Sequence, residues 1–290
     1  MDGGRKAAGE GSQMKAKILL ALLALVLALT LAAPALAVPT QRKASASGLT
    51  VFAAASLNHV FPAMVQPFKK ANPAYKKARI VFNFQGTDTL VSQIQAGATC
   101  DVFAGASTKY GKTLLDAGLI ASPVNFCQNT LVVAIPRKNP GLVHNLQELA
   151  IPGKTIAIGD SAVPIGTYTR TVLTNLSKDP AYGADYQAKV LANVVANCTN
   201  VNVITSLVVI GEVDAGFIYK SDAQYVAKYV QQIAVPADFQ SNPLPTYPIA
   251  VTKSTTNAAF SQAWIDYVMS AKGQALMVKY GFLPKPVAGS

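Results

Sequence analysis

Short apolar strands and amphipathic helices alternate along this chain, and this alternation restricts the folds that are open to it. Residues 48–60 read as a buried strand, a run of small alanines and a helix start near Ser56, and a strand followed by a helix returns at 79–94 and 101–117. Strands that alternate with helices are typical of doubly wound α/β sheets with parallel strands. Ligands bind such sheets at the carboxyl ends of the strands, so the strand–helix junctions are the predicted location of a site.

Hydroxyl groups stand at two of these junctions. Ser56 is expected to be the N-cap of the first helix, and Thr87 or Asp88 the cap of the second. A helix start leaves backbone N–H groups without partners, and its dipole favours negative charge. The two junctions therefore predict an anion site. The alternative is that Ser56 is an ordinary capping serine with nothing bound to it.

The second half of the chain repeats this chemistry with other residue types. A strand over 154–160 leads to Pro164, and a proline that opens a helix leaves the N–H groups of Ile165 and Gly166 free to bind a ligand. A buried strand over 215–219 then ends in a tyrosine. These features predict a second α/β unit that contributes its own donors.

The N-terminal residues are typical of a secretory signal peptide. Lys15 and Lys17 precede an apolar stretch over 18–33, and Ala35-Leu36-Ala37 follows it as an A-x-A cleavage pattern. We expect residues 1–37 to be the signal peptide and cleavage to follow Ala37, with a membrane anchor as the alternative. The sequence leaves both Met1 and Met14 open as the start, and the absence of a cysteine just after the apolar stretch argues against a lipoprotein.

Charge and the rarer side chains exclude several classes of function. The net charge of +11 comes from scattered lysines without interleaved aromatic residues, which argues against nucleic-acid binding. Cys100, Cys127 and Cys198 allow one disulfide and one free thiol, and they form no C-x-x-C motif or Cys/His cluster that would bind zinc. His59 and His144 are expected to be surface or capping residues.

A set of motifs in a specific order resembles the substrate-binding proteins of molybdate ABC transporters, a family of type II periplasmic binding proteins. The resemblance runs from residue 49 to residue 282, and the motifs that carry it are TVFAAASL (50–57), GTDTLVSQIQAGA (86–98), DVFAGAS (101–107), GDSAVPIGTYTR (159–170), GEVDAGFIYKSD (211–222), YPIAV (247–251) and KGQALMVKYGF (272–282).

The resemblance implies an α/β fold of two doubly wound lobes joined by a two-strand hinge near Asn129 and Tyr247. The first lobe is expected to comprise residues 38–127 and 247–290, and the second residues 128–246. The oxyanion ligand, molybdate or tungstate, is expected to bind between the lobes without any cofactor. The family's binding positions fall on Ser56, Thr87, Ile165, Val201 and Tyr219.

The resemblance implies further properties that the residues alone do not. The expected partners are the membrane permease and ATPase of an ABC importer, and the expected state is a monomer in the periplasm or at the outer face of the membrane. By the family layout we expect a Cys127–Cys198 disulfide with Cys100 free. A carboxylate beside a dianion would repel it, so Asp88 is expected to cap its own helix and point away.

Two alternatives to molybdate binding come from different classes of function. A protein of the same fold could bind another tetrahedral oxyanion, such as sulfate or phosphate. A secreted serine hydrolase could use Ser56 as its nucleophile and His59 as its base, but no third group and no G-x-S-x-G motif is present. We therefore expect a binding protein and not an enzyme. The sequence does not separate tungstate from molybdate.

Overall fold

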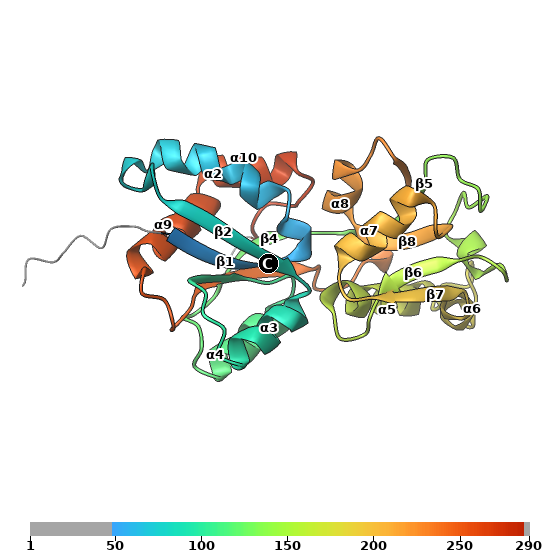
Figure 1. Cartoon of the computed structure of the whole chain (residues 1–290). Coiled ribbons are helices and arrows are strands. Elements are labelled where there is room, and N and C mark those ends of the chain that lie inside the picture. The colour runs from blue at the N-terminus through green and yellow to red at the C-terminus, as the bar shows by residue number, and fades with distance from the viewer. Residues whose placement is uncertain (1–47, 287–290) are drawn as a thin grey trace, which may run out of the picture. The chain divides into compact units, whose positions relative to one another are not determined.

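A computed structural model describes residues 48–286 of the chain, so the predicted signal peptide lies outside the described residues. The described part contains two five-stranded sheets with helices on both faces (Figure 1). We call the first sheet with its helices the first lobe, and the second sheet with its helices the second lobe. The α/β class and the two-lobe architecture predicted from the sequence are therefore confirmed.

The first sheet has the strand order β2-β1-β3-β10-β4. Strand β1 pairs in parallel with β2 and β3, whereas β10 pairs antiparallel with β3 and β4, so the sheet is mixed and not wholly parallel. The strands are β1 (Gly48–Ala54), β2 (Arg79–Gln85), β3 (Val102–Ala104), β4 (Val124–Gln128) and β10 (Thr246–Val251).

Helices cover both faces of the first sheet. Helices α2 (Val60–Ala71), α9 (Ala258–Met269) and α10 (Ala271–Lys279) lie on one face, and α3 (Thr87–Gln95) and α4 (Thr108–Asp116) lie on the other (Figure 1). Strand β1 serves both layers, because Val51 packs against the α2 side and its neighbour Phe52 against the α3 side. This double burial explains why β1 is an almost continuous apolar run, interrupted by Thr50.

The second sheet has the order β7-β6-β8-β5-β9, in which β6 is parallel to β7 and β8, and β5 is antiparallel to β8 and β9. Its strands are β5 (Leu131–Pro136), β6 (Ile156–Gly159), β7 (Val194–Cys198), β8 (Ala215–Tyr219) and β9 (Val230–Ala234). Its helices are α5 (Pro164–Leu176), α6 (Tyr186–Ala192), α7 (Val201–Ile210) and α8 (Lys220–Tyr225).

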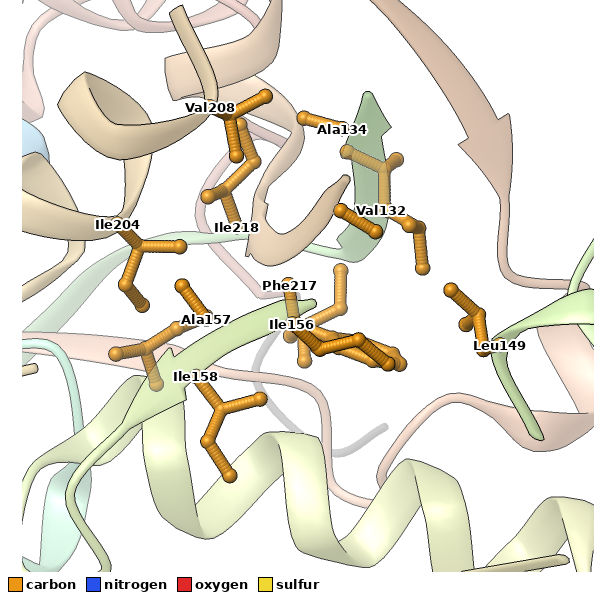
Figure 2. Close-up of a cluster of buried hydrophobic side chains, with 14 of the residues drawn as sticks. Val132, Ala134, Leu149, Ile156, Ala157, Ile158, Ile204, Val208, Phe217 and Ile218 are labelled. Atoms are coloured by element: carbon orange, nitrogen blue, oxygen red, sulfur yellow. The ribbon is translucent and has the colours of Figure 1, made fainter. Parts of the chain in front are cut away.

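Packing of α7 against the second sheet requires a glycine. Figure 2 shows Ile204 and Val208 of α7 beside the strand residues Ala157 and Ile218. A Cβ atom on Gly216 of β8 would lie 2.7 Å from the Cγ2 atoms of both Ile204 and Val208. A larger residue at 216 would therefore move α7, whose N-terminus faces the cavity described below.

Two chain segments connect the lobes, and they lie side by side. The first is the link from β4 to β5 through Asn129, and the second is the approach to β10. The Asn129 N–H donates to the Pro245 carbonyl at 2.9 Å, and Gln128 Nε2 donates to Thr246 Oγ1 at 3.1 Å. We call this pair the crossing segments. The limits of the two lobes given above stay a prediction.

The strands that the sequence did not predict all lie at sheet edges. Strand β4 ends the first sheet, and β7 and β9 are the two edges of the second. Each has several exposed positions and lacks the continuous apolar run of a central strand. Edge strands bury less, so hydrophobic periodicity detects them poorly.

Candidate functional site

A small cavity lies where the strand ends of the two sheets meet, and all five predicted binding residues line it. Its free space is about 20 Å³. A single water needs roughly 10–15 Å³ on the same measure, so the cavity has room for a small ion. The lining residues are Ala54, Ala55, Ser56, Gln85, Gly86, Thr87, Ala106, Val163, Pro164, Ile165, Asn200, Val201 and Tyr219.

Ser56 lies in a 3-10 turn over Ala55–Leu57 that directly follows β1, and it is not a helix cap. The expectation that Ser56 is an N-cap was therefore wrong. Its hydroxyl instead lies 3.0 Å from the hydroxyl of Tyr247, a residue on β10. This contact buries Ser56 at the end of β1 and holds its side chain at the cavity.

His59 occupies the N-cap position of α2, but its side chain makes no capping hydrogen bond. Its ring stacks on Tyr225 with the ring centroids 3.3 Å apart. Burial lowers the pKa of His59, so the neutral ring is favoured. The hydrogen bond found for Ser56 in residues 48–286 goes to Tyr247 and not to His59, so the geometry does not support a Ser–His pair.

Thr87 is the first residue of α3, and Gly86 is the N-cap. The Thr87 hydroxyl oxygen accepts a hydrogen bond from the Ala106 N–H at 3.1 Å. A hydroxyl oxygen that accepts this hydrogen bond can still donate its own hydrogen to an acceptor elsewhere. Thr87 is therefore held with its proton available at the cavity.

Asp88 does not cap α3, which corrects the expectation from the sequence. No side chain caps this helix, and Asp88 Oδ2 accepts only a long bond of 3.4 Å from Thr89. Its Oδ1 atom is buried and has no hydrogen-bond partner among the described residues. Asp88 is absent from the cavity lining, which agrees with the expectation that its carboxylate points away from the site.

The second lobe presents two helix starts to the cavity. Helix α5 begins at Pro164, and no side chain caps it, so the N–H of Ile165 is free of an intrahelical partner. Helix α7 is capped by Asn200, whose Oδ1 accepts from the N–H groups of Asn202 at 3.0 Å and Val203 at 3.3 Å. This cap leaves the Val201 N–H for a ligand.

Tyr219 is the last residue of β8 and is 2% exposed. Its hydroxyl is buried without a hydrogen-bond partner in the described part of the chain. Burial raises the pKa of Tyr219 well above its ordinary value, and the neighbouring Tyr247, Tyr168 and Asp222 raise it further. The hydroxyl thus stays protonated, and a buried donor without a partner indicates a ligand that the site is built to receive.

The cavity is electrically unusual because none of its lining residues carries a charge. Its donors are hydroxyl groups and backbone N–H groups at the starts of α3, α5 and α7. Helix N-termini carry partial positive charge, so the field in the cavity favours an anion without any counter-ion. Such a set of neutral donors can hold an anion but contains no nucleophile and base in contact.

The structure corrects the predicted disulfide. Cys100, Cys127 and Cys198 are all free and buried. Cys127 lies on β4 of the first sheet, and Cys198 lies on β7, at an edge of the second sheet. A disulfide needs two Cα atoms within about 7 Å of each other. Burial raises the pKa of the Cys127 thiol well above its ordinary value, which makes this thiol unreactive.

Several residues of the site were missed by sequence reasoning. Asn200 was detectable, because an asparagine directly before an apolar helix is a common N-cap. Gln85, Gly86 and Ala106 line the cavity because they flank the predicted junctions, and Tyr247 lies behind Ser56. Nothing local in the sequence marks Tyr247, since it is far from Ser56 along the chain.

Residues 48–286 contain no group of three or more His, Cys, Asp and Glu side chains that could hold a metal ion. Within the same residues, no helix combines the length and the apolar character needed to span a membrane.

Two α/β lobes with a ligand-sized cavity between their strand ends define the fold of the periplasmic binding proteins. The sequence model of the family described as bacterial extracellular solute-binding protein matches residues 49–283. The chain belongs to this family of solute-binding proteins, which are transport components and not enzymes.

Named relatives and a solved structure agree with this assignment. The chain is 33% identical to the molybdate-binding protein ModA of Mycobacterium tuberculosis over an alignment of 245 residues. This alignment covers 84% of this chain and 86% of that protein. The chain is 30% identical over 263 residues to ModA of Escherichia coli, covering 88% and 96% respectively. The periplasmic molybdate-binding protein of Azotobacter vinelandii has the same fold, with a TM-score of 0.68 at 23% identity over 82% of this chain and all of that one (100%).

Proposed function

We propose that this protein captures molybdate, and also tungstate, in the cavity between its lobes and delivers it to an ABC importer. Ser56, Thr87 and Tyr219 supply hydroxyl donors, and Ile165 and Val201 supply backbone N–H donors. The observation that carries this proposal is the buried hydroxyl of Tyr219, which has no hydrogen-bond partner among the described residues. The relatives named as molybdate-binding proteins support the choice of ligand.

The donor chemistry favours a fully deprotonated oxyanion. Molybdate at neutral pH carries no proton, so its oxygens accept hydrogen bonds and donate none. Hydrogen bonds to a charged acceptor contribute roughly 1.5–3 kcal/mol each, so several neutral donors suffice without a cation. Sulfate has the same charge and the same lack of a proton and is therefore the main competitor. Phosphate keeps at least one proton at neutral pH and needs an acceptor for it, and no carboxylate lines the cavity.

Calorimetric titration of the purified, ligand-free protein tests this function. Molybdate and tungstate are expected to bind more tightly than sulfate, and sulfate more tightly than phosphate. A ligand that binds only the folded state raises the melting temperature, so molybdate should also give a clear thermal shift. Absence of both heat and thermal shift at millimolar molybdate would refute the proposal, whereas tighter binding of sulfate would reassign the ligand.

Closure of the lobes is part of the proposed mechanism. The lobes, residues 38–127 with 247–290 and residues 128–246, close about the ligand by bending at the crossing segments near Asn129 and Tyr247. Small-angle scattering of the protein with and without molybdate should give a smaller radius of gyration in the bound state. An unchanged scattering profile would contradict this mechanism.

Export and partners complete the proposal. The signal peptide over residues 1–37 directs the chain across the membrane, and the mature protein acts there as a monomer that delivers its ligand to a permease with an attached ATPase. N-terminal sequencing of the exported protein is expected to begin at Val38. A mature protein that retains residues 18–33 would show a membrane anchor instead.

A further inference from the structure

A buried chain of polar side chains leads from the crossing segments to Ser56. Asn129 and Tyr247 are both fully buried, and each stands on one of the two crossing segments. The Nδ2 atom of Asn129 donates to Tyr247 Oη at 3.4 Å, and Tyr247 Oη lies 3.0 Å from Ser56 Oγ. Neither Asn129 nor Tyr247 lines the cavity, so both act on a ligand through residues that do, and the hydrogen-bonded one is Ser56.

One backbone group sets the orientation of the Asn129 amide. The Thr130 N–H donates to Asn129 Oδ1 at 3.0 Å, so the amide oxygen must face that group. The amide nitrogen then faces the other way and donates its two hydrogens to Ser221 Oγ at 2.9 Å and to Tyr247 Oη. The reversed amide would place two donors against each other at Thr130.

This orientation determines the direction of the two hydroxyl groups that follow. By distance alone, either hydroxyl of the Ser56–Tyr247 pair could be the donor. If Ser56 donated, Tyr247 Oη would accept from both Asn129 and Ser56, and its buried hydrogen would have no acceptor among the described residues, so we assign this hydrogen to Ser56 Oγ. Burial raises the pKa of Tyr247 well above its ordinary value, so this hydrogen is retained at neutral pH. Ser56 Oγ accepts from Tyr247, and its own hydrogen is directed to the cavity.

We propose that Asn129 and Tyr247 are positioning residues that hold Ser56 as a hydrogen-bond donor and thereby select oxyanions without a proton. This inference rests on the proposed oxyanion binding and names what decides between ligands of equal charge. If Tyr247 accepted from Ser56 instead, a serine lone pair would face the ligand. That arrangement suits an oxyanion that carries a hydrogen, such as hydrogen phosphate.

The substitution Asn129→Asp is the principal test, because it reverses the direction of the hydrogen bonds from residue 129 through Tyr247 to Ser56. A carboxylate accepts only, so Tyr247 donates to it and accepts from Ser56, whose hydrogen then turns away from the cavity. Affinities for sulfate and phosphate are measured by calorimetry at about pH 8, where the second phosphate proton has dissociated and both ligands are dianions. The added charge weakens both dianions alike, so the ratio of the two affinities reports the direction of the hydroxyl. The sulfate-to-phosphate ratio should fall by about tenfold or more, the effect of one hydrogen bond to a charged group.

A second variant and a matched control keep the test decisive. Tyr247→Phe removes the hydroxyl between Asn129 and Ser56 without adding charge, and the ratio should fall in the same direction by a smaller factor. Gln128→Glu makes the same change of amide to carboxylate one residue away, where the side chain contacts Thr246 and not Ser56. This control should keep the wild-type ratio.

The outcomes separate this inference from the function on which it rests. A wild-type protein that binds no oxyanion refutes both. A wild-type protein that binds sulfate or molybdate, with an unchanged sulfate-to-phosphate ratio in both Asn129→Asp and Tyr247→Phe, refutes the positioning role alone. An equal loss of the ratio in Gln128→Glu also refutes it, because the effect would then come from charge and not from the direction of the hydroxyl.

Discussion

The two lobes supply the cavity with donors of different kinds. The first lobe uses side-chain hydroxyls, and each has a partner that orients it: Ser56 contacts Tyr247, and Thr87 accepts from the Ala106 N–H. The second lobe uses the N–H groups at the starts of α5 and α7, together with the Tyr219 hydroxyl, which has no partner within residues 48–286. Side-chain donors of the first lobe are thus held by tertiary contacts. In the second lobe the backbone donors are held by helix geometry, and Tyr219 is held by its place at the end of β8.

This difference predicts how each lobe responds to substitution. A hydroxyl donor can be deleted by changing one side chain, but a backbone donor survives any substitution that leaves its helix in place. Variants in the first lobe should therefore change affinity and local stability together. Variants in the second lobe should separate the two properties.

The largest effect is expected at Gly86, which lies on the first lobe against the Thr199 backbone of the second. A Cβ atom on Gly86 would lie 2.5 Å from the Thr199 carbonyl oxygen, although the backbone conformation of Gly86 is open to any residue. Gly86→Ala should therefore block the approach of the lobes and weaken molybdate binding by more than about a hundredfold, which corresponds to roughly 3 kcal/mol. Calorimetry measures this loss.

Gly48→Ala is the matched control, because its nearest neighbour is an ordinary 3.4 Å away. We expect it to bind molybdate as the wild type does. If Gly86→Ala also binds normally, the close approach at Thr199 is not needed for binding, and the two lobes are less tightly coupled than we propose.

The next effect compares the hydroxyls of the two lobes. Tyr219→Phe removes a donor that has no protein partner, so affinity for molybdate should fall tenfold to a hundredfold or more, about 1.5–3 kcal/mol, while the melting temperature of the ligand-free protein hardly changes. Ser56→Ala should lower affinity by a similar factor and also lower stability, because Tyr247 loses its acceptor. Unchanged molybdate affinity in Tyr219→Phe would remove this residue from the site.

A pH effect distinguishes the second lobe from the first. Burial raises the pKa of Asp222 to about 7, and a hydrogen bond from Ser221 opposes this only in part. The folded protein therefore holds this proton more tightly than the unfolded chain, so the contribution of Asp222 to stability is greatest at acid pH. That contribution is lost as the pH rises through the folded pKa of about 7.

Asp222→Asn removes the cost of burying the charge. The variant should melt higher than the wild type above the folded pKa of about 7, and the difference should shrink toward pH 4. Each kcal/mol is expected to move the melting temperature by about 2–4 °C in a chain of this size. Thermal melts of both proteins across this pH range test the prediction. A difference in melting temperature that does not depend on pH would contradict the raised pKa of Asp222.

The smallest effect is expected at the cap of α7. Asn200→Ala removes the acceptor for the N–H groups of Asn202 and Val203 and should cost about 0.5–2 kcal/mol of stability. Affinity for molybdate should change less than in Ser56→Ala, because the Val201 N–H stays in place while the helix persists. Chemical denaturation and calorimetry on the same variant measure both quantities. A larger loss of affinity than of stability would show that Asn200 itself contacts the ligand.

The local pattern of this sequence predicted part of the set of residues that meet at the cavity. Strand ends followed by helix starts occur at Ser56, Thr87 and Ile165, and the carboxyl ends of parallel strands lie at one edge of a sheet. Helix starts carry free N–H groups whatever surrounds them, so the anion-binding character follows from backbone chemistry alone. The resemblance to molybdate-binding proteins added Val201 and Tyr219, and both line the same cavity.

Only the tertiary structure decided how those groups are held. Ser56 was predicted to cap a helix, but it contacts Tyr247, which lies 191 residues away along the chain. The predicted partners Cys127 and Cys198 lie on strands of different sheets and remain free. Periodicity and capping rules describe neighbours along the chain, whereas these contacts arise where the chain crosses from one lobe to the other and back. The sequence by itself therefore determined the α/β units and the donors at their junctions, and the crossing of the chain between two sheets decided the partners of those donors.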